Sequence, residues 1–370
     1  MAAAQTQESE VYFSLQRVLQ INTPISSLAF GHASHLFVGS GDGSLRVYDL
    51  STFKVVKAIK GLGSEVSSIV CVKRPSSELR DAWVGCGKQI LKFQLDMPKM
   101  ILEPSDALLT IEVGDNDQDE VNELAINVTK SHLAFSLDSG HVGVVDLKDN
   151  SIRRMNQPHT SVSGSVKFIP DWPKEIVSGG YDTALHHYNF TEGDLVARHE
   201  MPRSSSTGGT ELAPPFVMCT AVGSTGVVAA GTADGHLWLG YGGDKDQNDV
   251  SSKKKKSKKP SFWGGLHEEH HVELKIAEGP VVAMAFVSPW KITTSTMLGV
   301  VTQYLLDYDS SLGKLKISEL WEQKTHSIEK VNALVVDDKR IIIGGFDNNG
   351  RGMIELWQKG EQPPAAINSS

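Results

Sequence analysis

Short apolar stretches recur along most of the chain, and turns rich in glycine, proline and aspartate separate them. The clearest case is residues 159–189, HTSVSGSVKFIPDWPKEIVSGGYDTALHHYN. An apolar strand over 162–168 is followed by a second strand ending at Ser178, a turn carrying Asp182 and a third strand finishing on Tyr188. This pattern predicts a small antiparallel meander. Such a sheet cannot bury both faces alone, so its meaning depends on repetition elsewhere in the chain.

The same arrangement occurs near the N-terminus. Apolar strands are predicted over 25–30, 35–40, 46–50 and 54–59, with the turn GDGS between the second and third. Asp42 lies six positions before Tyr48, as Asp182 lies six before Tyr188. The equal spacing indicates a repeated four-stranded unit of about forty residues.

Seven such units are predicted. Their first strands begin at Ile25, Val66, Val121, Val162, Phe216, Val281 and Val331. The shorter intervals fit a bare four-stranded unit, and each longer one contains a polar or charged insertion. A chain of 370 residues would also allow two ordinary domains. The repetition instead predicts one all-β domain, a seven-bladed β-propeller of four-stranded antiparallel blades.

The two ends of the chain complement each other. The seventh unit reaches Trp357 without a fourth strand, while residues 9–19 form a spare strand with no neighbour nearby in sequence. We therefore expect the N-terminal strand to pair in the last blade, which closes the ring. The propeller then covers 9–358. Disordered segments are expected at 1–8 and 359–370, and in a Lys-rich insertion at about 242–266.

The best units resemble a known repeat. SGGYDTALHHYN and VGSGDGSLRVYD resemble the second and third strands of a WD repeat, with Tyr188-Asn189 and Tyr48-Asp49 at the Trp-Asp position. The chain from about 9 to 358 resembles a seven-bladed WD-repeat propeller, and residues 122–168 resemble one subgroup more narrowly. No unit keeps Trp-Asp, and most lack the family's Gly-His dipeptide.

The resemblance implies a structural hydrogen-bond chain through His159, Ser178, Asp182 and Tyr188, with Asp42 and Tyr48 as the first unit's counterparts. A buried carboxylate needs donors, and an imidazole between a carboxylate and a hydroxyl has both nitrogens satisfied. Ser, His and Asp together also suggest a hydrolase triad. Because no nucleophile elbow surrounds Ser178, we predict no catalytic residue.

Metal and cofactor chemistry have little support in the sequence. Residues 267–271, HEEHH, match the zinc-protease pattern HExxH, but that pattern requires a helix and these residues run into a predicted strand. We predict a solvated cluster and no metal site. Cys71, Cys86 and Cys219 lack paired spacing, so buried free thiols are expected. No phosphate-binding glycine loop opens a helix, and no cofactor is predicted.

A lysine run is the sharpest local charge signal. We consider nuclear import, a nonspecific phosphate-contacting arm and a solubilising insertion as its roles, and favour import. The candidate import residues are Lys253, Lys254, Lys255, Lys256, Lys258 and Lys259.

An acidic run between the second and third units is a candidate surface for a basic peptide or tail, because complementary charge steers association. A solvated loop is the alternative. The residues are Glu112, Asp115, Asp117, Asp119, Glu120 and Glu123.

Composition limits the function classes. The formal net charge is −8 and the pI about 5.9, so specific nucleic-acid binding is not expected. The first ten residues lack the features of a signal peptide, and no apolar run suits a membrane span, so we expect a nuclear or cytoplasmic protein.

We predict a non-catalytic scaffold for protein–protein interaction. The resemblance implies one version, a substrate receptor of a cullin-type ubiquitin ligase. Such receptors often carry Trp-Asp-x-Arg, whereas the matching sites read YDLST, VDLKD and YNFTE. Alternatives are a nuclear scaffold in ribosome assembly or chromatin, and a propeller hydrolase.

Overall fold

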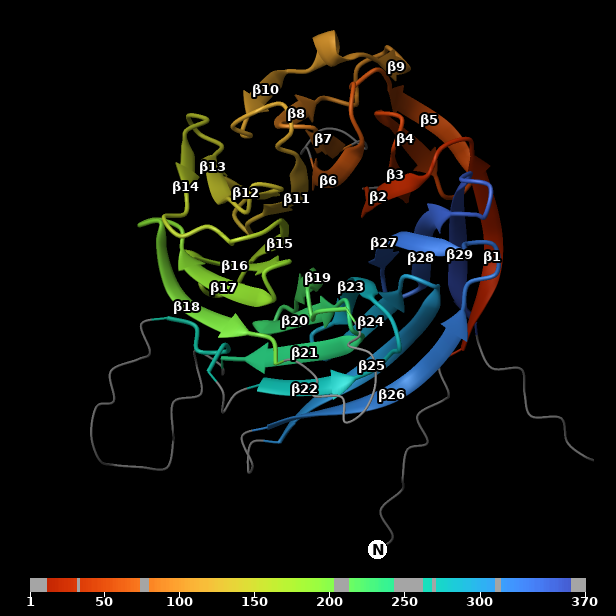
Figure 1. Cartoon of the computed structure of the whole chain (residues 1–370). Helices are drawn as coiled ribbons and strands as arrows, with labels where there is room; N and C mark the ends of the chain where they lie inside the picture. Colours follow the sequence, from red (N-terminus) through yellow and green to blue (C-terminus); the bar gives the residue numbers. More distant parts are fainter. Residues whose placement is uncertain are drawn as a thin grey trace, which may run out of the picture.

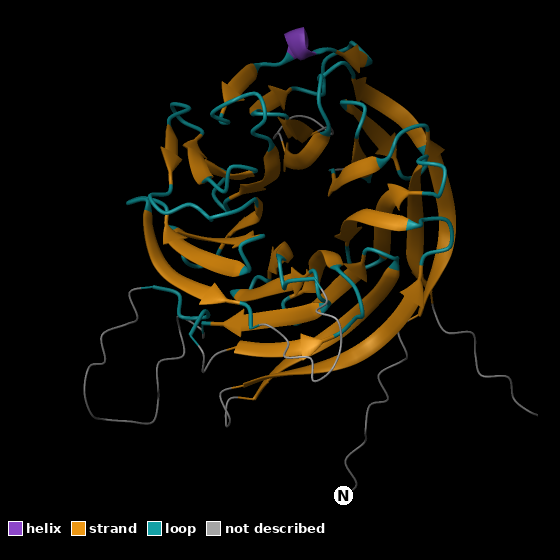
Figure 2. Cartoon of the chain, viewed as in Figure 1, coloured by secondary structure: helices purple, strands orange, loops and turns teal. Residues whose placement is uncertain are grey.

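Seven β-sheets surround a central channel in the computed structural model (Figure 1). The structure describes residues 12–31, 34–73, 80–202, 213–242, 262–267, 271–309 and 314–360. Strands make up almost all regular structure in these ranges, with one short 3-10 helix at Pro104–Asp106 (Figure 2). None of the helices described is long and apolar enough to cross a membrane. The prediction of an all-β, seven-bladed propeller is confirmed.

The innermost strand of each blade lines the channel, and the second strand pairs antiparallel with it. In blade order, the innermost strands are β2 (Ile25–Phe30), β6 (Val66–Lys73), β11 (Val121–Ile126), β15 (Ser163–Phe168), β19 (Val217–Val222), β23 (Val281–Ser288) and β27 (Lys330–Val336). The second strands are β3 (His35–Ser40), β7 (Arg80–Cys86), β12 (His132–Leu137), β16 (Glu175–Gly180), β20 (Val227–Thr232), β24 (Lys291–Thr296) and β28 (Arg340–Phe346).

The outer half of each blade follows the same antiparallel order. The third strands are β4 (Ser44–Asp49), β8 (Gln89–Phe93), β13 (Val142–Asp146), β17 (Ala184–Asn189), β21 (His236–Tyr241), β25 (Val300–Asp309) and β29 (Gly352–Gly360). The outermost strands are β5 (Lys54–Ile59), β10 (Leu109–Glu112), β14 (Ile152–Arg154), β18 (Asp194–Glu200), β22 (His271–Lys275), β26 (Lys314–Lys324) and, in blade 7, β1 (Tyr12–Ile21).

The N-terminal strand closes the ring, as predicted. β1 pairs antiparallel with β29, from Tyr12 opposite Gly360 to Ile21 opposite Gly352. Phe13 is only 2% exposed, and its ring lies 5.3 Å from that of Trp321 on blade 6. Strand β1 therefore joins the two ends of the chain and also packs against the neighbouring blade.

Two strands were not predicted. β26 completes blade 6 and pairs along the whole of β25. β9 (Ile101–Leu102) belongs to the connection within blade 2 but pairs in parallel with β5 of blade 1, making a five-stranded sheet. Lys57 on β5 holds this connection, since its Nζ donates to the carbonyl oxygens of Met97 and Lys99 at 2.5 and 2.8 Å. A two-residue strand held by a distant lysine has no periodic signal in the sequence.

The expected Lys-rich insertion at 242–266 ends earlier than predicted. Residues 262–266 return to the propeller, where Trp263 is 3% and Leu266 6% exposed. The Trp263 indole Nε1 donates to the carbonyl of Gly226 at 3.0 Å. Burial of an indole with a satisfied N–H stabilises this segment against blades 4 and 5.

A β-bulge occurs at the same place in every blade. In each, the register between the first two strands shifts at the second or third residue of the innermost strand, so one residue has no partner there. The seven unpaired residues are Ser26, Ser67, Asn122, Gly164, Met218, Val282 and Asn332. All seven line the channel. Bulges increase local twist, which suits strands packed around a central axis.

Close packing joins each blade to the next. A Cβ added at Gly179 on β16 would lie 2.4 Å from Cγ1 of Val217, the first residue of the next blade's innermost strand. Gly39 and Val66 show the same relation at 2.6 Å. The small residue admits the branched side chain of the following blade, so the repeated glycine before the turn serves contact between blades.

The two faces of the ring are distinct because strands alternate in direction. The connections into the innermost strands and the turns between second and third strands lie on one side, which we call the upper face. The connections after the first and third strands lie on the other side, the lower face. A channel of about 720 Å³ opens between the innermost strands.

Candidate functional site

The structure brings His159, Ser178 and Asp182 together in blade 4. His159 lies in the connection before β15, and its Nδ1 and Nε2 lie 2.8 Å from Asp182 Oδ1 and Ser178 Oγ. The Thr160 backbone N–H donates to Asp182 Oδ2 at 3.0 Å. A Cβ at Gly180 would lie 2.4 Å from His159 Nδ1, so only glycine fits beside this ring. Ser178 is fully buried and His159 is 3% exposed.

The carboxyl group of Asp182 is held in its ionised form. Burial by itself would raise its pKa, but the hydrogen bonds from His159 and Thr160 outweigh burial and lower the pKa to about 2. The carboxylate accepts the Nδ1 proton of His159, which leaves Nε2 to accept from the Ser178 hydroxyl. Each polar group is satisfied within the blade, and Ser178 does not face solvent as a nucleophile would.

Tyr188 lies beside this network and bonds a second histidine, His186, whose ring stacks on that of His159. Its hydroxyl donates to the carbonyl of Gln157 at 2.7 Å and accepts from His186 Nδ1 at 2.7 Å. Arg198 Nε donates to the other nitrogen of His186 at 3.2 Å. Burial, together with His159 and Arg198, lowers the pKa of His186 to about 3, so the ring is neutral. Burial raises the pKa of Tyr188, against an opposing effect of the neighbouring Ser178 hydroxyl.

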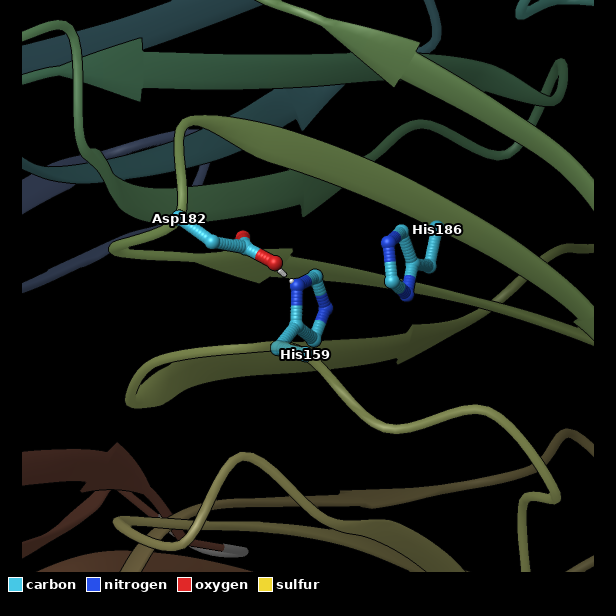
Figure 3. A group of neighbouring side chains, drawn as sticks. All are labelled: His159, Asp182 and His186. Carbon is cyan, nitrogen blue, oxygen red and sulfur yellow. Dashed lines mark hydrogen bonds and ion pairs between the residues drawn. The ribbon is translucent and has the colours of Figure 1, made fainter.

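His159, Asp182 and His186 have the atoms of a metal site but not its orientation. Their ligand atoms lie within 4.8 Å of one another. The two imidazoles stack almost parallel, with centroids 3.9 Å apart and 9° between the planes (Figure 3). Nitrogen lone pairs lie in the ring plane, so stacked rings cannot both point at one ion. Every ring nitrogen also has a partner already.

In blade 1 the turn aspartate is held by two serines and an arginine instead of a histidine. Asp42 Oδ1 accepts from the hydroxyls of Ser40 and Ser44, at 3.0 and 2.6 Å. Arg46 Nη1 donates to both hydroxyls. Burial by itself would raise the pKa of Asp42, but the hydrogen bonds from the two serines and the charge of Arg46 outweigh burial and lower the pKa. Tyr48 is 6% exposed within an apolar cluster.

Two buried glutamates accept hydrogen bonds that the sequence did not predict. Glu175 Oε2 accepts from His187 Nε2 at 2.7 Å and from the Trp263 backbone N–H at 2.9 Å. Glu355, fully buried in blade 7, accepts from two backbone N–H groups, a serine hydroxyl and the Trp357 indole. Their only sequence signal is a carboxylate inside an apolar strand, because the donors come from other segments.

Most of the acidic run forms ion pairs or hydrogen bonds with other residues of the propeller. Lys88 Nζ lies 2.8 Å from Glu112 and 2.7 Å from Asp117, and Arg154 lies 2.6 Å from Asp115. Asp119 is 2% exposed and accepts from the backbone and hydroxyl of Ser139.

The last two members of the run differ from each other. Glu123 turns into the channel, where it accepts from the Val166 N–H at 2.8 Å and pairs with Lys167. Glu120 is exposed and has no ion-pair partner among the described residues. The six carboxylates are close together in the sequence. In the structure, Glu120 is the one of the six whose carboxylate has no partner among the described residues.

Glu120 lies on the upper face near another carboxylate. Glu65 occupies the connection before β6, and burial and the Glu120 charge raise its pKa. No ion pair to Glu65 occurs in the described part of the chain. Burial, followed by smaller effects of Glu120 and Glu65, also raises the pKa of the Cys86 thiol, which donates to the Ser64 carbonyl at 3.0 Å.

Some of the other candidate residues lie outside the described residues. These are Lys253 to Lys259 and residues 268–270 of the HEEHH sequence. His271 begins strand β22, where the helix of a zinc protease would be required. The three cysteines are free thiols, Cys86 buried and Cys71 and Cys219 half-buried. Burial raises the pKa of Cys219 to about 12, so its thiol stays protonated.

Comparison with known proteins agrees with this architecture. No protein-family model matches the chain. It is similar to the WD repeat-containing protein 53 homolog of Dictyostelium discoideum, at 24% identity over 171 residues. The match covers 45% of this chain and 44% of the relative's length. The narrower resemblance of residues 122–168 was to WD repeat-containing protein 53, and this relative's name agrees with it. Seven four-stranded blades and a ring closed by the N-terminal strand establish a seven-bladed β-propeller, and this likeness supports a propeller of the WD-repeat type.

Proposed function

We propose that this propeller is a non-catalytic scaffold that holds other proteins on its loops. Propellers of this family are in general non-enzymatic and bind proteins. The observation that carries the proposal is the state of the Ser178–His159–Asp182 group. Its hydrogen bonds are all made inside blade 4, where Ser178 is fully buried. The constellation therefore supports a rigid ring, and the loops are left to bind partners.

Affinity purification of the tagged full chain tests this function. We expect stable partners that a chain with Asp182→Ala, which loosens blade 4, recovers less well. A purified protein that hydrolyses small esters, with activity lost on Ser178→Ala, would contradict a scaffold without catalysis.

A more specific role is that of a substrate receptor for a cullin-type ubiquitin ligase. The family resemblance supports it, and so does one feature of the lower face. Asp49, Asp146 and Asn189 accept from the backbone N–H two residues on, at 2.8, 2.9 and 3.1 Å, so each ends its third strand in the same turn. In blade 3 the residue so presented is Lys148, an exposed cation where ligase receptors carry arginine.

Co-purification with the cullin adaptor tests this role. Lys148→Glu should reduce recovery of the adaptor, because a negative charge replaces the cation. Lys174→Glu, another exposed lysine on the lower face, is the matched control. Absence of any cullin or adaptor from the wild-type purification would contradict the role.

A nuclear or cytoplasmic location belongs to the same proposal. The lysine run supports nuclear import, and a nuclear scaffold of ribosome assembly or chromatin is the alternative to a ligase receptor. A fluorescent fusion with Lys253, Lys254, Lys255 and Lys256 changed to Ala should leave the nucleus. Unchanged nuclear accumulation would contradict the import signal.

A further inference from the structure

A small cavity lies between blade 3 and blade 4, whose strands β13, β14 and β17 are labelled in Figure 1. Its volume is about 220 Å³, and it shares no lining residue with the central channel. The residues around it lie at the ends of the third strands β13 and β17 and beside β14, so the cavity opens toward the lower face. It is therefore separate from the channel and from the upper face.

Strand alternation turns polar side chains of blade 3 into this cavity. Val144 and Asp146 lie two residues apart on β13, and Arg153 on β14 pairs opposite Val144. Residues two apart on a strand, and residues directly opposite each other on neighbouring strands, point to the same face. Val144 is 2% exposed and packs with Phe190 of blade 4 in one apolar cluster. Asp146 and Arg153 therefore also face blade 4, while Val144 and Phe190 form the floor of the cavity.

Three other gaps between neighbouring blades are filled by large aromatic side chains. Trp263 lies between blades 4 and 5, Tyr308 between blades 5 and 6, and Phe13 between blades 6 and 7. Blade 3 instead ends in β14, which at three residues is the shortest fourth strand of any blade. Its contribution to the gap is Ser151 and Arg153, and the space beside them stays open.

Arg153 and Asp146 carry opposite charges into the cavity but do not pair with each other. Arg153 is exposed and forms no ion pair or hydrogen bond with any residue that the structure describes. Asp146 Oδ1 accepts from the Lys148 backbone N–H at 2.9 Å. Its Oδ2 lies 3.8 Å from His132 Nε2, which is beyond hydrogen-bond distance. The side chains of His132 and Asp146 are 29% and 38% exposed, so a ligand can reach them.

Two unpaired charges of opposite sign in one cavity favour a ligand that carries both charges. A carboxylate matches the forked donors of the Arg153 guanidinium. An ammonium group supplies donors for Asp146 Oδ2, which accepts no hydrogen bond in the described part of the chain. In an α-amino acid both groups are attached to one carbon, so a ligand of this kind fits a cavity smaller than the roughly 300–1,000 Å³ typical of drug-sized ligands.

The hydroxyl groups of Ser151 and Thr191 set the character of the remaining space. Both residues are exposed and line the cavity. Thr191 Oγ1 donates to Asn189 Oδ1 at 2.7 Å, so the lone pairs of its oxygen remain able to accept. A ligand whose side chain ends in a short hydroxyl donor fits this end of the cavity better than one with a long apolar chain.

We propose that the cavity between blades 3 and 4 binds a free α-amino acid with a short hydroxyl side chain, its carboxylate on Arg153 and its ammonium group on Asp146. The two carboxylate oxygens of Asp146 then have separate roles, since Oδ1 ends the third strand in its turn and Oδ2 binds the ligand. The site goes beyond the scaffold function and does not depend on it, because no partner protein takes part.

Saturation-transfer difference NMR on the purified full chain tests the site, with L-serine as the probe. Ethanolamine and 3-hydroxypropionate are the comparison compounds, because each is serine without one of its charged groups. We expect saturable binding of L-serine and about tenfold weaker binding of either comparison compound, since each loses one charge-assisted hydrogen bond. Equal binding of all three compounds, or no saturable binding of L-serine, would overturn the proposal.

Two variants locate the binding. Arg153→Gln should weaken L-serine binding about tenfold without weakening that of ethanolamine, which has no carboxylate. Asp146→Asn should weaken L-serine binding to the same extent without weakening that of 3-hydroxypropionate. Asparagine keeps the turn, because Asn189 ends the third strand of blade 4 with the same hydrogen bond. Binding of L-serine at wild-type strength by both variants would place the ligand elsewhere and overturn the site.

The matched controls are Lys54→Gln and Asp49→Asn, which remove the same charges from the lower face of blade 1. Asp49 ends its third strand in the same turn as Asp146. Both control positions lie outside the cavity, so these variants should bind L-serine like the wild type. A loss of binding in the controls equal to that in the cavity variants would reveal general charge attraction and contradict a site between blades 3 and 4.

Discussion

At the centre of blade 4, folding makes Asp182 more acidic than an ordinary aspartate. Its side chain is 5% exposed, and its hydrogen bonds lower the pKa from 3.8 to about 2. A group whose pKa falls on folding stabilises the folded state above its unfolded pKa, and this contribution is lost as pH falls through the folded pKa.

Asp182→Asn should therefore destabilise the protein by about 1–3 kcal/mol at pH 7, because it weakens the hold on His159. The difference from wild type should shrink as pH falls from about 3.8 to about 2. Urea unfolding across this range measures it. Asp149→Asn, on an exposed turn, is the control and should cost little. A constant difference down to pH 2 would show that the ionised carboxylate is not what stabilises the blade.

Two buried threonines of blade 5 differ in whether the side-chain hydroxyl forms a hydrogen bond, so together they measure the cost of an unsatisfied hydroxyl. Thr220 has no hydrogen bond, whereas Thr232 donates to Asp234 at 2.5 Å and accepts from the His236 N–H at 2.9 Å. Thr220→Val should stabilise the free protein by about 1 kcal/mol, and Thr232→Val should destabilise it by about 1–2 kcal/mol. Thermal unfolding of both variants gives the comparison. Destabilisation by Thr220→Val would indicate that this hydroxyl is already satisfied.

At the scale of elements, residues 262–266 pack against both blade 4 and blade 5. Trp263 packs directly on Gly242 at the other end of the insertion, where an added Cβ would lie 2.4 Å from its ring. The backbone N–H of Trp263 donates to the carboxylate of Glu175, which also accepts from His187 Nε2. The two ends of the insertion are thereby fixed next to each other on the ring.

Trp263→Ala should cost about 3–5 kcal/mol, because it leaves a large cavity in the cluster that includes Trp238 and Leu266. Phe262→Ala, one residue away and 40% exposed, should cost less than about 1 kcal/mol. Chemical denaturation with tryptophan fluorescence and circular dichroism measures both. Equally small losses of stability in the two variants would mean that residues 262–266 do not stabilise the fold.

At the scale of the whole molecule, ring closure depends on β1 alone among the strands described, since it is the one that joins the two ends of the chain. Without it, β29 would present an unpaired edge and Trp321 would lose its contact with Phe13 of β1. An exposed edge strand invites association with other chains.

A chain that begins at residue 22 should therefore unfold less cooperatively and aggregate more readily than the full chain. A synthetic peptide of residues 12–21, added in trans, should restore a single sharp transition, and a scrambled peptide should not. Calorimetry and light scattering report the two effects. Unchanged cooperativity of the truncated chain would show that the ring closes without this strand.

The relation of sequence to structure differs between fold and site. Alternating apolar strands, turn residues and the equal spacing from Asp42 to Tyr48 and from Asp182 to Tyr188 indicated the repeats, because these signals are local. The vacancy in the seventh unit and the spare N-terminal strand indicated closure. The β9 pairing gave no such signal, because it depends on Lys57 reaching a connection about forty residues later.

By itself, the sequence determined an all-β ring of seven repeats, since strand periodicity and turn chemistry act within a few residues. Only the tertiary structure decided which charges remain free. Lys88 and Arg154 neutralise Glu112, Asp117 and Asp115 across distant segments, while Glu65 and Glu120 are left unpaired on the upper face. Charge neutralisation depends on which side chains the fold brings within a few ångströms, and local sequence does not contain that distance.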